Sequence, residues 1–164
     1  MSVTIRQIID YLDRLKQLHE SLLTLSKKKT EALKNNEIDS LRNCLTQERK
    51  HVSAIEALEK KRIAAVSDWA ASEPDFNGEN PTVSEIIEWV DWSERQQLEC
   101  VYESFILVLA ELKQQEVLNA DLTRQSLQFV NMSLDLFQPT LENVNYGGSL
   151  QTSGPKRSVF DSQA

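Results

Sequence analysis

A stretch of forty residues, from Leu98 to Phe137, contains neither glycine nor proline. Its apolar side chains return at steps of three and four residues, which places them on one face of an α-helix. The stripe consists of Leu98, Val101, Phe105, Leu109 and Leu112, and it resumes with Phe129, Val130, Leu134 and Phe137. At about 1.5 Å per residue such a helix would be roughly 60 Å long. It needs other long helices beside it to cover this stripe.

The residues that break helices fall in two places only. The four glycines and four prolines gather between residues 74 and 81 and beyond residue 138. The rest of the chain can be helical. The expected fold is all-α: an elongated antiparallel helical hairpin, a short helix and a long C-terminal helix, which together make a three-to-four-helix bundle or coiled coil. Residues 1–138 should form this bundle, and residues 139–164 a flexible tail.

Two long helices are expected before the first cluster of breakers. The first runs from about Val3 to Leu33, and the second from about Glu37 to Ala71. The polar segment between them predicts a tight corner, in which Asn36 caps the second helix. A short corner makes the pair an antiparallel hairpin. The residues expected to face inward are Ile5, Ile8, Leu12, Leu15, Leu18, Leu22 and Leu25 in the first helix, and Leu41, Leu45, Val52, Ile55, Leu58, Val66 and Trp69 in the second.

A loop over residues 73–81 precedes the last helices. Thr82 and Glu85 have the spacing of a capping box, so a helix should begin at Val83. A second capping signature, from Ser93 to Gln96, predicts a break between a short helix that ends at Asp91 and the long one. A single bent helix over residues 83–138 is the alternative.

Charge and composition exclude several classes of function. The net charge of −7 argues against a general nucleic-acid binder, because attraction to phosphates supplies most of such binding. The two cysteines, Cys44 and Cys100, have no C-x-x-C partner, and small side chains at helix seams are the expected role for both. The N-terminus has no secretory apolar region, and no apolar run has membrane length. We therefore expect a reduced, cytoplasmic protein.

The search for catalytic chemistry yields one weak lead. Glu48 and His51 form an E-x-x-H pair on a helix, a spacing that di-iron bundles use in two copies. The only other histidine, His19, has Lys16 in place of the glutamate, so a solvated or seam-edge His51 is favoured over a metal ligand. Glycine-poor helices also cannot form phosphate or oxyanion cradles. We expect no enzyme, no cofactor, no metal and no small-molecule substrate.

Other polar and aromatic signals have plain structural interpretations. The basic runs at residues 27–29 and 60–62 are expected to be solvated helix surface at separate heights of the hairpin. Trp89 and Trp92 should pack the short helix onto the bundle rather than line a ligand pocket. The hypothesis that remains is binding by a helical surface, at the apolar patch of Leu127, Phe129, Val130, Leu134 and Phe137. The alternative is that these side chains complete the chain's own core.

Three motifs, in order along the chain, resemble the FlgN family of flagellar export chaperones. Residues 32–41 resemble the family's "A-L-x-x-x-D-x-x-x-L" corner. Gln47-Glu48, followed by Val52, Ile55, Leu58-Glu59 and Arg62, resembles its "E-x-x-L-x-x-I-x-x-L-E-x-x-R" helix. Asn119, Leu122, Ser126-Leu127 and Phe129-Val130 resemble its "N-x-x-L-L-x-x-S-L-x-x-I" segment, with Thr123 in place of the second leucine.

The resemblance implies a cytoplasmic chaperone of a type III secretion system. Such a protein binds the C-terminal segments of the hook–filament junction proteins FlgK and FlgL, keeps them unassembled and delivers them to the export gate at the membrane. The apolar patch would hold the client helix, and Tyr146 in the tail would contact the gate. The alternative function is a structural coiled-coil protein that forms a homodimer or stalk, and a metal-dependent helical bundle is a third.

Overall fold

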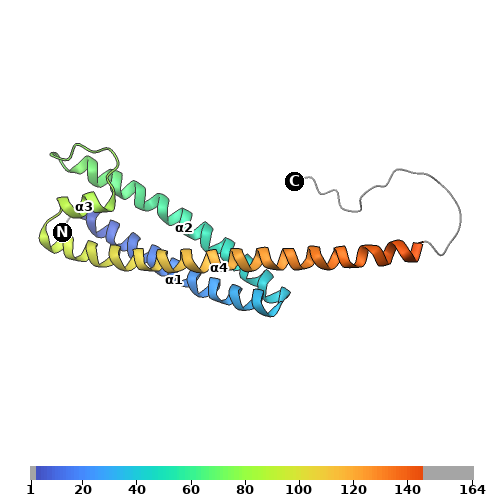
Figure 1. Cartoon of the computed structure of the whole chain (residues 1–164). Coiled ribbons are helices and arrows are strands. Elements are labelled where there is room, and N and C mark those ends of the chain that lie inside the picture. The colour runs from blue at the N-terminus through green and yellow to red at the C-terminus, as the bar shows by residue number, and fades with distance from the viewer. Residues whose placement is uncertain (1–2, 146–164) are drawn as a thin grey trace. The chain divides into compact units, whose positions relative to one another are not determined.

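The computed structural model describes the backbone of residues 3–145 and the side chains of residues 4–136. Within these residues it contains four helices and no strand: α1 (Val3–Asn35), α2 (Ile38–Ser72), α3 (Val83–Trp89) and α4 (Trp92–Asn145) (Figure 1). The all-α prediction is confirmed. The chain divides into two compact units, Met1–Ser126 and Leu127–Ala164, and the boundary falls within α4. Across the described range, none of the helices has both the length and the apolarity needed to cross a membrane.

The corner between α1 and α2 forms where the sequence predicts it. Asn36 has a φ of 55°, the left-handed conformation that commonly ends a helix. The backbone N–H of Glu37 then donates a hydrogen bond to the carbonyl of Ala32 at 3.0 Å, so the last turn of α1 is closed. The expectation that Asn36 caps α2 is wrong. The left-handed backbone of Asn36 ends α1. The N-cap residue of α2 is Glu37, whose side chain makes no capping hydrogen bond.

The break between the last two helices is also confirmed, and the single bent helix is excluded. α3 begins with the predicted capping box: the Thr82 hydroxyl accepts a hydrogen bond from the Glu85 N–H, and the Glu85 carboxylate accepts one from the Thr82 N–H. The cap of α4 differs from the prediction. The Asp91 carboxylate accepts the Glu94 N–H at 2.9 Å, so Asp91 starts the helix two residues before Ser93.

The end of α4 lies further along the chain than expected. The sequence predicts that the helix ends at residue 138, before Pro139, whereas α4 continues to Asn145. A proline removes one backbone hydrogen bond from a helix but does not have to terminate it. Residues 146–164 lie outside the described range, so the flexible tail stays a prediction.

Contacts between the helices fix their directions within residues 3–126. Lys29 pairs with Glu48, and Ser21 with His51, so α1 and α2 run antiparallel as predicted. Between α1 and α4, by contrast, the residue numbers of contacting pairs rise along both helices. The ring of His19 contacts Phe105, and residues 26–30 form hydrogen bonds with residues 115–119. The first part of α4 is therefore parallel to α1, since α3 and its flanking loops return the chain to the end where α1 begins (Figure 1).

The apolar core is concentrated near that same end. Trp69 is its largest fully buried side chain, at 1% exposure. The other buried members are Ile5, Ile8 and Leu12 of α1, Ala65, Val66 and Ala70 of α2, Ile86 of α3, Val90 after it, and Leu98 and Val101 of α4. Leu45 and Val52, predicted to face inward, are exposed.

Candidate docking surfaces

The sequence-predicted binding patch lies on an exposed part of α4. Its four members with described side chains, Leu127, Phe129, Val130 and Leu134, are exposed by 47–72%. The side chain of Phe137 and the whole of Tyr146 lie outside the described residues. Sequence reasoning missed Met132 and Leu136, which are exposed by 65% and 75%. Their spacing from Phe129, three and then four residues, was the signal that could have found them.

The helical backbone divides this patch into two stripes. Leu127, Val130 and Leu134 follow one another at steps of three and four residues, and Phe129, Met132 and Leu136 do the same. At about 100° per residue, the two stripes lie roughly 160° apart around the helix axis. The predicted patch is therefore not a single surface, because Phe129 lies on the opposite side from Leu134. A helix that is apolar on two sides needs cover on both.

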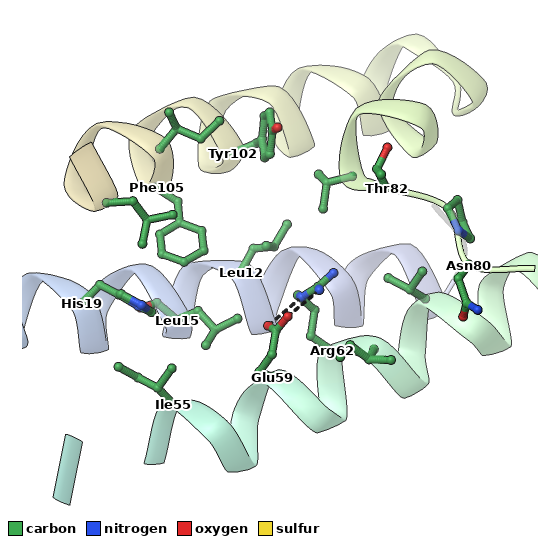
Figure 2. Close-up of a pocket in the computed structure, with 16 residues that line it drawn as sticks. Leu12, Leu15, His19, Ile55, Glu59, Arg62, Asn80, Thr82, Tyr102 and Phe105 are labelled. Carbon is green, nitrogen blue, oxygen red and sulfur yellow. Dashed lines mark hydrogen bonds and ion pairs between the residues drawn. The ribbon is translucent and has the colours of Figure 1, made fainter. Parts of the chain in front are cut away.

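A second apolar surface lies within residues 3–126, where α2 and α4 form the sides of a groove with α1 at its base. The groove has a volume of about 720 Å³. Figure 2 shows Tyr102 and Phe105 of α4 on one side, Ile55 of α2 on the other, and Leu12, Leu15 and His19 of α1 between them. The remaining lining residues are Glu59, Arg62, Ile63, Val66, Asn80, Pro81, Thr82, Val83, Ile106 and Leu109. Ile63, Ile106 and Leu109 are only partly covered, at 38–49% exposure.

The groove contains one ion pair among its apolar side chains. Glu59 accepts hydrogen bonds from Nε and Nη2 of Arg62, at 2.8 and 2.6 Å (Figure 2). The hydrogen bonds that Arg62 donates to Glu59 raise the pKa of Arg62, so the guanidinium stays a fixed cation on the α2 wall. At the opposite wall, the hydroxyl groups of Tyr102 and Ser84 lie 3.2 Å apart, and this contact links α4 to α3. Neither polar contact has the geometry of a nucleophile beside a base.

A buried polar layer joins α1, α2 and α4 farther along the bundle. Asn119 is only 2% exposed, and its amide nitrogen donates hydrogen bonds to the carbonyl and hydroxyl of Ser26, each at 3.0 Å. Its amide oxygen accepts a hydrogen bond from Thr30. Beside them, Lys29 bridges two glutamates: its Nζ lies 2.5 Å from Glu48 and 3.1 Å from Glu116. The polar break in the α4 stripe therefore faces a matching polar strip on α1.

This layer corrects two sequence interpretations. Lys29, expected to be solvated with the rest of its basic run, is buried, while its neighbours Lys27 and Lys28 are exposed. Glu48, half of the E-x-x-H pair, turns to Lys29 rather than to a shared metal position with His51. The ring of His51 instead lies at the α1–α2 seam, within 2.8 Å of the Ser21 hydroxyl and of the Gln47 carbonyl. Among the described residues no group of three metal-ligating side chains is present.

The tryptophans near α3 differ from each other. The ring of Trp89 packs against Phe76, with a centroid distance of 5.4 Å. Phe76 in turn packs against the buried Trp69, with a centroid distance of 5.2 Å. The prediction that Trp92 also packs onto the bundle is wrong, because its side chain is 73% exposed. At the first position of α4 it points away from the core that Leu98 and Val101 enter. Cys44 is buried, as expected of a seam residue, whereas Cys100 is exposed.

Comparison with known proteins identifies the family of the chain over nearly all of its length. Residues 1–154 match the FlgN protein family. A protein of Bacillus subtilis strain 168, the uncharacterized protein YvyG, is 42% identical over 162 residues, which cover 97% of this chain and 98% of YvyG. No solved structure gives a significant match. The chain belongs to the FlgN family, a family of flagellar export chaperones rather than of enzymes.

Proposed function

We propose that this chaperone holds the C-terminal helical segments of the hook–filament junction proteins FlgK and FlgL in the cytoplasm. It keeps them from assembling before export and delivers them to the export gate, with Tyr146 as the contact to the gate. The observation that supports this proposal is the pair of exposed apolar stripes on α4, between Leu127 and Leu136. Six large apolar side chains exposed within ten residues are typical of a surface that a partner covers.

In the proposed mechanism, α4 competes with the client's assembly partners for the client's amphipathic terminal helix. A client that assembles through an amphipathic terminal helix must leave that helix uncovered until assembly, and α4 can cover it earlier by helix-to-helix packing. Burying about 500 Å² of apolar surface contributes on the order of 10 kcal/mol, of which the loss of translational and rotational freedom removes a large part. Micromolar or tighter binding is therefore attainable without any nucleotide. A client that contacts both stripes would have to wrap around α4.

Substitution of one residue from each stripe tests this function. We expect Leu134→Glu and Phe129→Glu each to weaken capture of purified FlgK and FlgL at least about tenfold, because each places a charge in the apolar contact. Binding is measured by fluorescence anisotropy or pull-down. Gln128→Glu is the matched control, since it adds the same charge to the same segment of α4 at a position outside both stripes. Loss in only one of the two variants would identify the stripe that the client uses.

Two results would contradict the proposal. The first is that the folded native chain binds neither junction protein. The second is that Leu134→Glu unfolds the chain in circular dichroism, which would mean that this side chain completes the chain's own core. A homodimer is the second candidate function, because two stripes could each meet a second copy. Light scattering separates the two functions: a stable dimer that Leu134→Glu dissociates, with no capture of FlgK or FlgL, would favour the homodimer.

A further inference from the structure

We infer that the groove between α2 and α4 is a second docking site, and that it binds one amphipathic helix whose apolar stripe is flanked by lysine or arginine. This inference rests on the proposed chaperone function and assigns it a site separate from the exposed stripes of residues 127–136. The helix would come from a client, whose stripe would contact Ile63, Ile106 and Leu109.

The arrangement of the helices supports a helical occupant. α1 packs on both α2 and α4, and these three helices leave open the place that a fourth helix occupies in a four-helix bundle. The groove side of α2 extends from Ile55 to Val66, about 16 Å along the axis, which matches three helical turns. Asn80 and Thr82 lie at one end (Figure 2) and close it. An incoming helix would therefore stop against the loop before α3.

The lining explains why the occupant should be amphipathic. Ile63, Ile106 and Leu109 are partly covered already, so a packed helix would remove the rest of their surface from water. The Glu59–Arg62 pair is closed on itself through Nε and Nη2, and Arg62 keeps Nη1 for a polar group of the incoming helix. A site of this composition, apolar with a few placed polar groups, is typical of a specific binding site.

The charged residues at the rim of the groove indicate the sign of the charge that the bound helix should carry. Glu56 lies one turn before Glu59 on α2, Glu103 lies three residues before Ile106 on α4, and Glu79 precedes Asn80 at the closed end; all three are exposed. Of the basic residues, Arg62 lies in the groove but is paired with Glu59, Lys60 follows Glu59 on α2, and Lys113 lies one turn after Leu109 on α4. Exposed carboxylates therefore lie beside the α2 wall, beside the α4 wall and at the closed end, and they complement basic flanks on the bound helix.

The same charge argument disfavours a second copy as the occupant. The exposed apolar segment of α4, residues 127–136, contains Asp135 and neither lysine nor arginine. Placed in the groove of another copy, it would bring no basic side chain to Glu56 or Glu103. A foreign helix with basic flanks fits the site better.

A peptide of defined pattern tests the site without a known client. The probe is a labelled 18-residue peptide of leucine and lysine, with its leucines at steps of three and four. Two comparison peptides accompany it: one of the same composition with the leucines scrambled, and one with glutamate in place of lysine. We expect the patterned leucine–lysine peptide to bind the full chain at least about tenfold tighter than either comparison peptide, because only it combines the apolar stripe with the basic flanks.

Variants at the partly exposed rim locate the binding. Ile63→Gln and Ile106→Gln should each weaken the peptide about tenfold, and Glu103→Lys should do the same through charge. Leu107→Gln and Glu111→Lys are matched controls: Leu107 adjoins Ile106 but lies outside the groove, and Glu111 lies on the far side of α4. Neither control should change the affinity by more than about twofold.

The failures of this inference and of the chaperone function are distinguishable. Equal binding of the patterned and scrambled peptides, or a loss caused by Leu134→Glu but not by Ile106→Gln, overturns the groove site and leaves capture of FlgK and FlgL intact. A dimer in light scattering that Ile106→Gln dissociates would make a second copy the occupant of the groove. Val159 and Phe160 are apolar residues of the chain's own segment 139–164, and peptide binding that appears only after both are changed to glutamine would make that segment the occupant. Either result overturns the inference. Peptide binding in the groove without capture of either junction protein overturns the proposed function alone.

Discussion

Trp69→Ala is expected to lower the free energy of unfolding by about 3–5 kcal/mol, the cost typical of removing a large buried aromatic side chain. Trp69 is 1% exposed, and it contacts Phe76 of the loop after α2. Phe76 continues the contact to Trp89 of α3. The substitution would therefore leave a cavity in the core and remove the support of the segment that connects α2 to α4. A small domain is stable by about 5–15 kcal/mol, so much of its stability would be lost.

Urea unfolding followed by far-ultraviolet circular dichroism measures this effect without using tryptophan fluorescence. The matched control is Trp92→Ala, which removes the same side chain from a position that is 73% exposed. A surface change of this kind should stay within about 0.5 kcal/mol of the native chain. Equal losses at Trp69 and Trp92 would contradict the placement of the core. A native-like stability of Trp69→Ala would show that the α3 end is not what stabilises the bundle.

The sequence was sufficient for the parts of the fold that local rules determine. The absence of glycine and proline outside two segments predicts the long helices, and the left-handed preference of asparagine predicts the corner at Asn36. The pairing of Thr82 with Glu85 predicts the start of α3. The two predicted caps that are wrong, Asn36 and Ser93, miss the N-cap position by one and two residues. Asn36 adopts the left-handed backbone that ends α1, and Asp91 caps α4 before the chain reaches Ser93.

The candidate surfaces could be predicted only in part, since they depend on which helix covers which face. Periodicity marks Leu45 and Val52 as apolar positions, but it cannot show that both side chains are exposed. The groove arises from the separation of α2 and α4, which no local pattern records. The two stripes near the end of α4 could have been predicted from the sequence, because Met132 and Leu136 follow Phe129 at steps of three and four residues. In the sequence, Asn119 interrupts the apolar stripe of α4. Its burial depends on the packing of α4 against α1, which the sequence pattern does not record.

Lys29→Met is expected to lower the free energy of unfolding by about 2–3 kcal/mol, somewhat less than the cost of breaking a fully buried ion pair, because Glu116 keeps some contact with water. The methionine retains the length and apolar stem of lysine but removes the charge that Glu48 and Glu116 share. Two carboxylates from α2 and α4 would then face each other beside Ser26. Lys28→Met, at the exposed neighbour, is the matched control and should change stability by less than about 0.5 kcal/mol.

A triple variant separates charge from packing. Adding Glu48→Gln and Glu116→Gln to Lys29→Met removes the facing charges and should recover most of the lost stability, since the neutral amide at position 116 can keep the hydrogen bond to Ser26. If the triple variant is no more stable than Lys29→Met, the loss comes from the stem of Lys29 rather than from its charge. If Lys29→Met itself is as stable as Lys28→Met, the bridge between α2 and α4 contributes nothing, and the polar layer would serve only to set the register of the helices.

The pH dependence of the same variant provides an independent test. Burial lowers the pKa of Lys29, but the hydrogen bonds to Glu48 and Glu116 outweigh it, so the pKa of the folded state is raised above 10.5. A group whose pKa is higher in the folded state stabilises fully below its unfolded pKa and ceases to do so as the pH rises through the folded value. The difference in unfolding free energy between the native chain and Lys29→Met should therefore stay constant from about pH 7 to pH 9. It should shrink above pH 10.5, as measured by urea midpoints at each pH. A difference that persists unchanged at about pH 12 would mean that the ammonium group is not the source of the stabilisation.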